Sequence, residues 1–233
     1  MAIQVNNLTF QYDDKPVLKN ITLTIERGSF TAIIGANGSG KSTLAKHFNA
    51  LLLPTKGEVL IDGINTRKHD YAIRKKVGFV FQNFEDQIIY PIVAEDIAFG
   101  LENLALKHEV IKKTVHETME KLHIQKLAHA NVNTLSLGQK QLVALAGVLA
   151  MKPEYIIFDE PTTMLDVENK KNILSIMQAL NEEDTVTIVM ITNVLDDITY
   201  AKNIIVLQEG KVIFNDKKAL LDKKTLKEMY LYG

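Results

Sequence analysis

The sequence predicts an α/β protein in which a core built on a parallel sheet carries an amino-terminal antiparallel β layer. Two observations predict it. The first 30 residues alternate polar with apolar side chains, and short apolar strands later alternate with helices. We therefore expect one domain over residues 1–233.

Three stretches predict the antiparallel layer. "IQVNNLTFQYDD" (residues 3–14) and "VLKNITLTIERGSF" (residues 17–30) alternate polar with apolar residues, and "GEVLIDG" (residues 57–63) resembles them. Between them, "FTAIIGANGSGKSTLAKHFNALLLP" (residues 30–54) passes from an apolar strand through a glycine-rich loop into a helix. We expect this helix to stop before Pro54, because the residue that precedes a proline disfavours helical geometry.

The remaining elements follow from periodicity. Apolar residues recur with helical spacing from Ile111 to Leu122, which predicts a helix over about residues 109–130 with a charged outer face. A run of β-branched and apolar residues without alternation is typical of a strand buried on both faces of a parallel sheet. Further helices are expected at residues 136–151, 167–180 and from about 217, and further strands at residues 155–158, 185–191, 203–208 and 211–216.

Composition limits the classes of function. The chain has 46% hydrophobic and 24% charged residues, which is ordinary for a globular protein, and its net charge of -1 predicts no nucleic-acid partner. It has no cysteine and therefore no disulfide framework or thiolate metal site, and its six histidines show no metal-ligand spacing. No run of about 18 apolar residues occurs, so we expect the chain not to span a membrane.

Residues 35–42, "GANGSGKS", match the phosphate-loop pattern in full and stand between a predicted strand and a predicted helix. Glycines let backbone amides converge on a polyphosphate, Lys41 can reach the outer phosphates, and the Ser42 hydroxyl can ligate Mg²⁺. The alternative is a plain glycine turn before a helix. The residues expected to contact the nucleotide are Gly35, Asn37, Gly38, Ser39, Gly40, Lys41, Ser42 and Thr43.

Two acids follow the apolar strand "YIIF". Asp159 stands where a carboxylate can hold Mg²⁺ directly or through water. Glu160 lies beyond the strand end, where its side chain can turn toward a γ-phosphate and orient or deprotonate the attacking water. The alternative is that both acids form a solvated strand end.

"LSLGQ" (residues 135–139) contains a capping box, because Gln139 stands three residues after Ser136. A capped helix start with the small Gly138 also presents free amides, which suits a second anion site. The phosphate loop, "LSLGQKQ" and "IIFDEPTTMLD", in that order, resemble the nucleotide-binding subunits of ATP-binding-cassette (ABC) transporters over essentially the whole chain. The resemblance implies a P-loop NTPase core of the RecA-like type that uses ATP and Mg²⁺, with an inserted α-helical subdomain at about residues 86–150.

The same resemblance implies roles for further residues. Tyr12 would stack on adenine, Gln82 would be the lid glutamine near Mg²⁺ and the water, and Asp166 would be the loop acid that communicates between subunits. Simpler interpretations are a surface or core aromatic, a loop amide and a helix cap. In this family a signature, here Ser136, Gly138 and Gln139, closes over the nucleotide of the other subunit. The implied partner is therefore a second ABC ATPase subunit, identical or paralogous.

Within that family, "VGFVFQNFEDQIIYPIVAEDIAFGLENL" (residues 77–104) and "QLVALAGVLAMKP" (residues 141–153) most resemble the ATPases of energy-coupling-factor (ECF) importers, which take up vitamins and transition-metal ions. The resemblance implies an integral membrane partner near "QNFEDQ" (residues 82–87) and a peripheral location on the cytoplasmic face of the membrane. The sequence departs from the family pattern at Leu137, where glycine is usual, and at Leu142, where arginine is common. It is also expected to lack the extra carboxyl-terminal domain of longer members.

Three other functions remain open. One is the ATPase of another ABC transporter class. A second is a soluble ABC ATPase of DNA repair or translation, although repair members carry a long coiled coil between phosphate loop and signature, and no sustained heptads lie between Lys41 and Ser136. The third is a regulatory subunit that hydrolyses ATP weakly.

Asn193 motivates the third alternative. It follows the strand in "MITN", where ABC ATPases ordinarily have the switch histidine that touches the γ-phosphate. Asparagine can donate a hydrogen bond but cannot become cationic, and its side chain is shorter. The sequence therefore predicts slow hydrolysis at this subunit's own site. The simpler interpretation of Asn193 is a loop starter.

Overall fold

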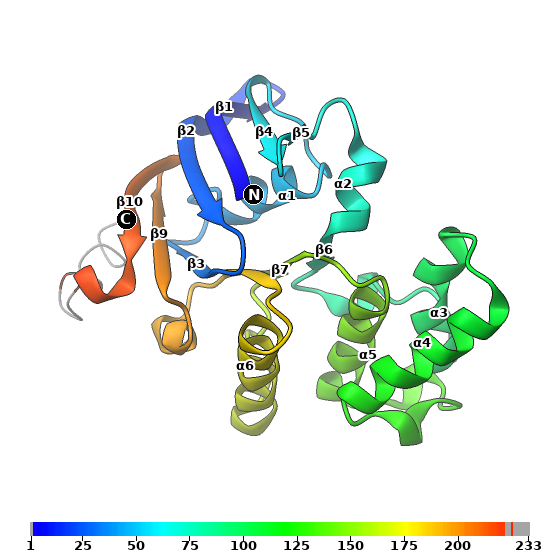
Figure 1. Cartoon of the computed structure of the whole chain (residues 1–233). Coiled ribbons are helices and arrows are strands. Elements are labelled where there is room, and N and C mark those ends of the chain that lie inside the picture. Colours follow the sequence, from blue (N-terminus) through cyan, green and yellow to red (C-terminus); the bar gives the residue numbers. More distant parts are fainter. Residues whose placement is uncertain (1, 222–224, 226–233) are drawn as a thin grey trace.

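An antiparallel sheet of four strands in the order β2–β1–β4–β5 forms the amino-terminal part of the protein (Figure 1). The computed structural model describes residues 2–221 and residue 225. The strands of this sheet are β1 (Ala2–Tyr12), β2 (Lys15–Glu26), β4 (Lys56–Ile61) and β5 (Ile64–Asn65). Their alternating burial follows the alternation of the sequence, so the expected antiparallel layer is confirmed.

A second sheet of six strands, in the order β10–β9–β3–β8–β7–β6, forms the core. All its neighbours pair in parallel except the edge strand β10, which pairs antiparallel with β9. The strands are β3 (Phe30–Ile34), β6 (Val77–Val80), β7 (Tyr155–Asp159), β8 (Thr187–Ile191), β9 (Asn203–Gln208) and β10 (Lys211–Lys217). The predicted α/β fold with a parallel core sheet is confirmed.

The register of this sheet places three loops at one edge. In β8, Ile191 pairs with Ile33 of β3 on one side and with Asp159 of β7 on the other. The three strands run in parallel, so the residues that follow them leave the sheet at the same level. In open α/β sheets this carboxyl edge is where ligands bind.

The helices α1, α2 and α6 lie next to the sheets, and α3, α4 and α5 form a group on one side (Figure 1). The helices α3, α4 and α5 pack on one another in that group. The α-helices are α1 (Lys41–Phe48), α2 (Asp70–Lys76), α3 (Val93–Asn103), α4 (His108–Lys121), α5 (Leu137–Ala150) and α6 (Val167–Glu182). The 3-10 segments are Phe84–Asp86, Gln125–Leu127, Val132–Thr134, Leu195–Thr199 and Lys218–Leu220.

Two helices end earlier than the sequence pattern predicts. The expected helix over residues 109–130 ends at Lys121, because His123 adopts a left-handed φ of 57° and Ile124 N–H bonds back to Met119 O at 2.9 Å. The helix after the phosphate loop ends at Phe48 in the same way, with Ala50 at φ 58°. Both endings have the hydrogen-bond pattern of a Schellman motif, but neither uses the glycine that would have signalled it.

Other differences concern elements that the sequence analysis did not predict. It did not predict α2, α3 or β6. The polar helix expected from about residue 217 is wrong at its start, since β10 extends to Lys217 and a 3-10 turn follows. The rest of that expected helix lies mostly outside the described residues.

Helix α1 lies between the two sheets and fixes the position of the loop before it. Its Leu44, Ala45 and Phe48 are buried in one hydrophobic cluster with residues from both sheets, including Ile3, Val59 and Val189. A second cluster fills the space among the core sheet, α6 and the helices α3–α5. Because interiors are close-packed, the start of α1 cannot shift without disturbing both sheets.

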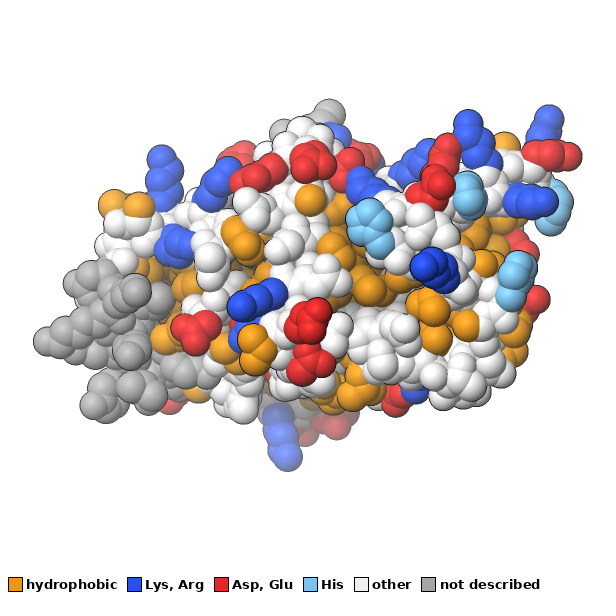
Figure 2. All heavy atoms as spheres, turned by 90° about the horizontal axis from the view of Figure 1, so that it is seen from below, with side chains coloured by type: hydrophobic (Ala, Val, Ile, Leu, Met, Phe, Trp, Pro, Cys, Tyr) orange, Lys and Arg blue, Asp and Glu red, His pale blue; other side chains and the backbone are white. Residues whose placement is uncertain are grey.

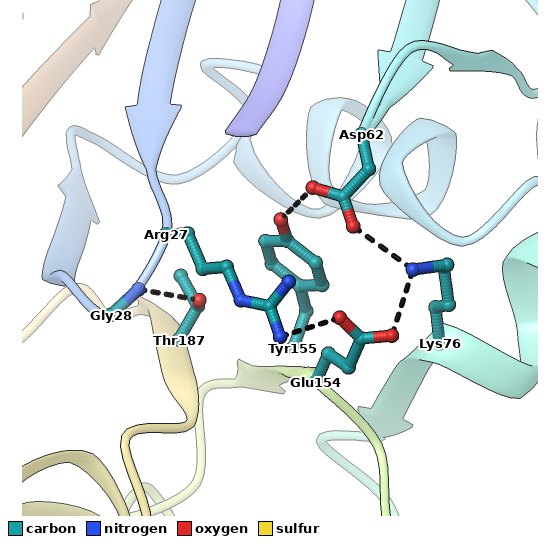
Figure 3. Close-up of polar contacts among 7 residues, drawn as sticks. All are labelled: Arg27, Gly28, Asp62, Lys76, Glu154, Tyr155 and Thr187. Atoms are coloured by element: carbon teal, nitrogen blue, oxygen red, sulfur yellow. Dashed lines mark hydrogen bonds and ion pairs between the residues drawn. The ribbon is translucent and has the colours of Figure 1, made fainter. Parts of the chain in front are cut away.

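A polar network joins the two sheets at the opposite edge of the core sheet (Figure 3). The Tyr155 hydroxyl donates to Asp62 Oδ1 at 2.5 Å, and Lys76 Nζ bonds Asp62 Oδ2 at 3.0 Å and Glu154 Oε1 at 2.7 Å. Arg27 adds an ion pair to Glu154 at 2.7 Å. Burial alone would raise the pKa of Asp62, but the bonds from Tyr155 and Lys76 outweigh it and lower that pKa.

We predict that Tyr155→Phe lowers the free energy of unfolding by about 1.5 to 3 kcal/mol, the range for a hydrogen bond to a charged group. Asp62 has a lowered pKa in the folded state, so its contribution is present above its ordinary value of 3.8 and is lost as the pH falls. The difference from wild type should therefore shrink below that pH. Urea denaturation at pH 7 and pH 3 measures both effects.

The matched control is Tyr71→Phe, because Tyr71 is 59% exposed on α2. That variant should unfold within about 0.5 kcal/mol of wild type. Equal stability of the Tyr155 and Tyr71 variants at pH 7 would show that the network does not stabilise the junction of the sheets.

Candidate functional site

The phosphate loop connects β3 to α1 and is closed by its own lysine. Lys41 is only 4% exposed, and its Nζ donates to Gly35 O at 2.9 Å and to Ala36 O at 3.0 Å. Burial lowers the pKa of Lys41, while the nearby charges of Glu160 and Asp159 act in the opposite direction. The ammonium therefore lies inside the loop, where a bound phosphate would meet it.

Glycine is required where this loop leaves the sheet. Gly35 has φ 149°, and a Cβ there would lie 2.1 Å from Leu207 O of the neighbouring strand β9. Gly40, the N-cap of α1, has φ 102°. The structure thus supports the interpretation of the loop as more than a plain turn, because two of its glycines permit a close backbone path that other residues would block.

The other residues named by the sequence belong to this loop or to the first turn of α1, and their contact with a nucleotide stays a prediction. Gly38 has φ 82° with open space beside it, and Ser39 is buried within the loop. Thr43 lies in the first turn of α1, where its carbonyl accepts from the ring of His47.

Ser42 and Asp159 meet across the edge of the sheet. Ser42 Oγ donates to Asp159 Oδ1 at 2.8 Å, and Asp159 is 4% exposed at the end of β7. Burial raises the pKa of Asp159, with the Ser42 bond opposing. A buried carboxylate beside a hydroxyl is a pair of hard oxygen ligands, and Mg²⁺ is commonly held by one or two such protein groups together with phosphates. These residues therefore fit Mg²⁺.

The histidines are the other candidate metal ligands. Four of the six lie between the end of α3 and the start of α5, at positions 108, 116, 123 and 129. Figure 2 shows histidine side chains on the surface of the half that contains α3–α5. No group of three His, Cys, Asp or Glu in the described part of the chain could hold a metal ion. The pair Ser42 and Asp159 needs phosphate oxygens to complete a coordination shell, which is the usual situation for Mg²⁺.

Glu160 turns away from the strand that precedes it. It has a left-handed φ of 48°, and its N–H donates to Ile191 O of β8 at 2.9 Å. Its Oε2 accepts from Gln82 Nε2 at 3.1 Å and from Thr163 Oγ1 at 3.2 Å. The left-handed turn takes the chain out of the strand at this edge, and the Glu160 carboxylate meets Gln82 and Thr163 there.

Asn193 lies against the phosphate loop. It follows β8 by two residues, and its Nδ2 donates to Asn37 Oδ1 at 3.2 Å. The simple interpretation as a loop starter therefore omits a contact, because the side chain reaches a loop 156 residues away in the chain. Its role as a substitute for the switch histidine stays a prediction.

Tyr12 lies at the end of β1, and the signature residues lie at the start of α5. Tyr12 is 45% exposed at the end of β1 and packs edge to face on Phe10, with ring centroids 4.9 Å apart. Ser136 is the N-cap of α5, and the predicted capping box is present: Gln139 N donates to Ser136 Oγ at 3.3 Å, and Ser136 N donates to Gln139 Oε1 at 3.0 Å. Among the described residues, no hydrogen bond or ring contact joins the signature residues to the phosphate loop, whereas Phe10, on which Tyr12 packs, contacts His47 of α1, the helix that follows the loop.

Gly138 and Asp166 meet through Asn169, a residue that the sequence analysis missed. Asp166 is the N-cap of α6 and accepts from Asn169 N at 2.9 Å and from Asn169 Nδ2 at 2.7 Å. A Cβ on Gly138 would lie 2.4 Å from Asn169 Oδ1. These bonds lower the pKa of Asp166. The interpretation of Asp166 as a helix cap is confirmed. An asparagine three residues after an N-cap aspartate is the signal that could have found Asn169.

Comparisons with known proteins identify the family. The family model described as "ABC transporter" matches residues 18–163. A curated relative from Caldanaerobacter subterraneus subsp. tengcongensis, the energy-coupling factor transporter ATP-binding protein EcfA1, is 44% identical over 98% of this chain and 86% of its own length. The chain belongs to the ABC transporter family, among its energy-coupling-factor ATP-binding proteins, and is an ATPase coupled to transport.

Solved structures agree with this assignment. CbiO1 from Clostridium perfringens, described as part of the ABC transporter complex CbiONQ, has a TM-score of 0.88 and 35% identity over 97% of this chain and 92% of its own. A dimeric ATP-binding cassette in a post-hydrolysis state, bound to ADP and Pi, has a TM-score of 0.81 and 34% identity over 92% of this chain and 98% of its own. The expected family is therefore confirmed.

Leu137 and Leu142, which depart from the family pattern, lie in different surroundings. Leu137 is exposed in the first turn of α5, whereas Leu142 is buried in the cluster of α3–α5. Leucine at 142 thus contributes to packing where family members often have arginine.

Within the described residues, every helix is too short or too polar to cross a membrane.

We predict that Glu160→Gln reduces ATP turnover by about 100-fold or more while the affinity for ATP stays within a few-fold of wild type. The amide keeps the size of the side chain but cannot accept a proton. Steady-state hydrolysis and equilibrium ATP binding measure the two quantities separately. The matched control is Glu109→Gln on the exposed surface of α4, which should hydrolyse ATP at the wild-type rate. Wild-type turnover in the Glu160 variant would refute its assignment as the base.

Proposed function

We propose that this chain powers the uptake of a vitamin or a transition-metal ion as an ATP-hydrolysing subunit of an energy-coupling-factor importer. The observation that carries the proposal is the meeting of the phosphate loop with Asp159 and Glu160 at one edge of the core sheet. Two positioned acids next to a phosphate loop suit hydrolysis rather than nucleotide storage. The ECF names of the curated relatives support the choice of importer.

Each residue at this edge has a distinct task in the proposed mechanism. The loop amides and Lys41 bind the phosphates. Ser42 and Asp159 would hold Mg²⁺, which would neutralise developing phosphate charge. Glu160 orients or deprotonates the attacking water, and its bond to Gln82 holds the carboxylate in position until that water and the nucleotide arrive.

A second ATPase subunit, identical or paralogous, would complete the site. Tyr12 is exposed and free to stack on an adenine ring, but the signature residues of this chain lie elsewhere, so they would serve the nucleotide of the partner. Around the signature and Asp166, Leu137, Met164 and Val167 are large apolar residues at the surface. An apolar surface beside exposed helix amides suits a contact that closes when ATP binds.

An integral membrane subunit is the second proposed partner, and it would hold the chain peripherally on the cytoplasmic face of the membrane. A largely apolar groove of about 300 Å³ lies among α2, α3 and α5. Tyr71 and Ile89 at this groove are 59% and 60% exposed. Ile89 lies two residues after the "QNFEDQ" stretch that begins with Gln82, so a partner seated here would contact the segment that bonds Glu160.

Co-purification tests the assignment to a transporter. Extraction of the native complex in detergent should recover this chain together with an integral membrane protein and a second ABC ATPase, and mass spectrometry of the complex should identify a bound vitamin or metal ion. A chain recovered only with ribosomes or DNA would contradict the proposal and favour a soluble ABC ATPase.

A weakly hydrolysing regulatory subunit is the second candidate, and Asn193 is the observation that favours it. Asn193 stands where ABC ATPases ordinarily have histidine. Its amide reaches Asn37 in the phosphate loop. An amide is neutral and shorter than an imidazole, so its contact with a γ-phosphate would be weaker or mediated by water.

We predict that Asn193→His raises ATP turnover at this chain's own site by about tenfold, equivalent to about 1.4 kcal/mol in the barrier. Turnover is measured in the native complex after the partner's site has been inactivated by substitution of its phosphate-loop lysine. Asn193→Gln, which lengthens the amide without adding a charge, is the control and should not show this gain. Fast hydrolysis by the wild-type site with no gain in the histidine variant would refute the prediction.

A further inference from the structure

A buried carboxylate lies behind the site and takes no direct part in the chemistry described above. Asp197 belongs to the 3-10 segment Leu195–Thr199 and is fully buried. Its Oδ2 accepts hydrogen bonds from Thr162 Oγ1 and, at 3.2 Å, from Thr192 Oγ1. Its Oδ1 forms an ion pair with Lys170 Nζ of α6. A carboxylate removed from water costs several kcal/mol unless such partners compensate it, so these contacts fix the group in one position.

The two threonines belong to the loops that carry the chemistry. Thr162 lies two residues after Glu160, and Thr192 immediately precedes Asn193. Both threonines are buried, at 4% and 1% exposure. Asp197 therefore holds the loop after β7 and the loop after β8 to one carboxylate oxygen.

The lysine extends the same network toward the signature. Lys170 lies one turn into α6, whose N-cap is Asp166. Asn169 precedes it and contacts both Asp166 and the position of Gly138. A continuous chain of contacts thus leads from the Thr162 and Thr192 loops through Asp197 and α6 to the start of α5.

We propose that Asp197 is a positioning residue for ATP hydrolysis. It sets the separation of the Glu160 and Asn193 loops through the two threonines, and it ties both loops through Lys170 to the surface that carries Asp166 and the signature. The inference rests on the ATPase function of this chain. Groups of one hydrogen-bonded network act jointly, so loss of one arm should displace a loop without removing any group that touches the nucleotide.

Thr162→Val tests the inference most cleanly. Valine keeps the branched shape but removes the hydroxyl that bonds Asp197, and it does not alter the side chains of Glu160, Gln82 and Thr163. We expect kcat for ATP hydrolysis in the native complex to fall about tenfold with KM changed less than about twofold. Thr162→Ser restores a hydroxyl and should recover most of kcat, which a purely packing role of the methyl group would not explain.

Thr187→Val is the matched control. Thr187 lies at the opposite end of β8, is fully buried like Thr192, and its Oγ1 accepts a hydrogen bond from Gly28 N at 2.9 Å. It has no contact with Asp197 among the bonds of the described residues, so its loss should lower the unfolding midpoint and leave kcat unchanged. Thermal unfolding of every variant confirms that the assayed protein is folded.

A double-mutant cycle tests the link to α6. Lys170→Gln removes the ion pair with Asp197, and it should reduce kcat less when combined with Thr162→Val than when introduced alone, because both act through one carboxylate. Wild-type kcat in Thr162→Val, or equal loss of kcat in the Thr162 and Thr187 variants, would overturn the inference. A wild-type complex that hydrolyses no ATP would contradict the proposed function itself, and this inference with it.

Discussion

The hydrogen bond from Ser42 to Asp159 is the interaction on which the site depends. It joins the phosphate loop after β3 to the end of β7 across 117 residues of sequence, although β8 lies between these strands. The parallel register makes the bond possible, because it ends the three strands at one level. A hydroxyl and a buried carboxylate brought together in this way fit the Mg²⁺ that we propose binds next to the phosphate loop.

The rest of the fold holds that edge in place while leaving its loops able to respond. Helix α1 is clamped between two sheets, and the network of Asp62, Tyr155 and Lys76 joins those sheets at the far edge. By contrast, side-chain hydrogen bonds connect Glu160, Gln82 and Asn193 to neighbouring loops. Such bonds can be exchanged for bonds to a nucleotide or a water, whereas the packed core cannot rearrange without large cost.

The sequence predicted the features that depend on a few adjacent residues. The phosphate loop, the acids Asp159 and Glu160 and the capping box at Ser136 each follow from local chemistry, and the structure shows the loop and the cap as expected. The predicted end of α4 was wrong, because His123 adopts a left-handed conformation that the pattern of side chains does not reveal. Asp197 was not predicted because its partners Thr162 and Lys170 meet it only after the chain has folded.

The most direct test of this account is the dependence of ATP affinity on Mg²⁺. ATP binding is measured by titration with and without Mg²⁺ for wild type, Asp159→Asn and Ser42→Ala, with folding checked for each. The account predicts that Mg²⁺ tightens ATP binding to wild type by about tenfold or more and that either variant loses most of this gain, because each lacks one oxygen ligand or its charge. An undiminished Mg²⁺ effect in both variants would contradict the central claim that these two residues form the metal site.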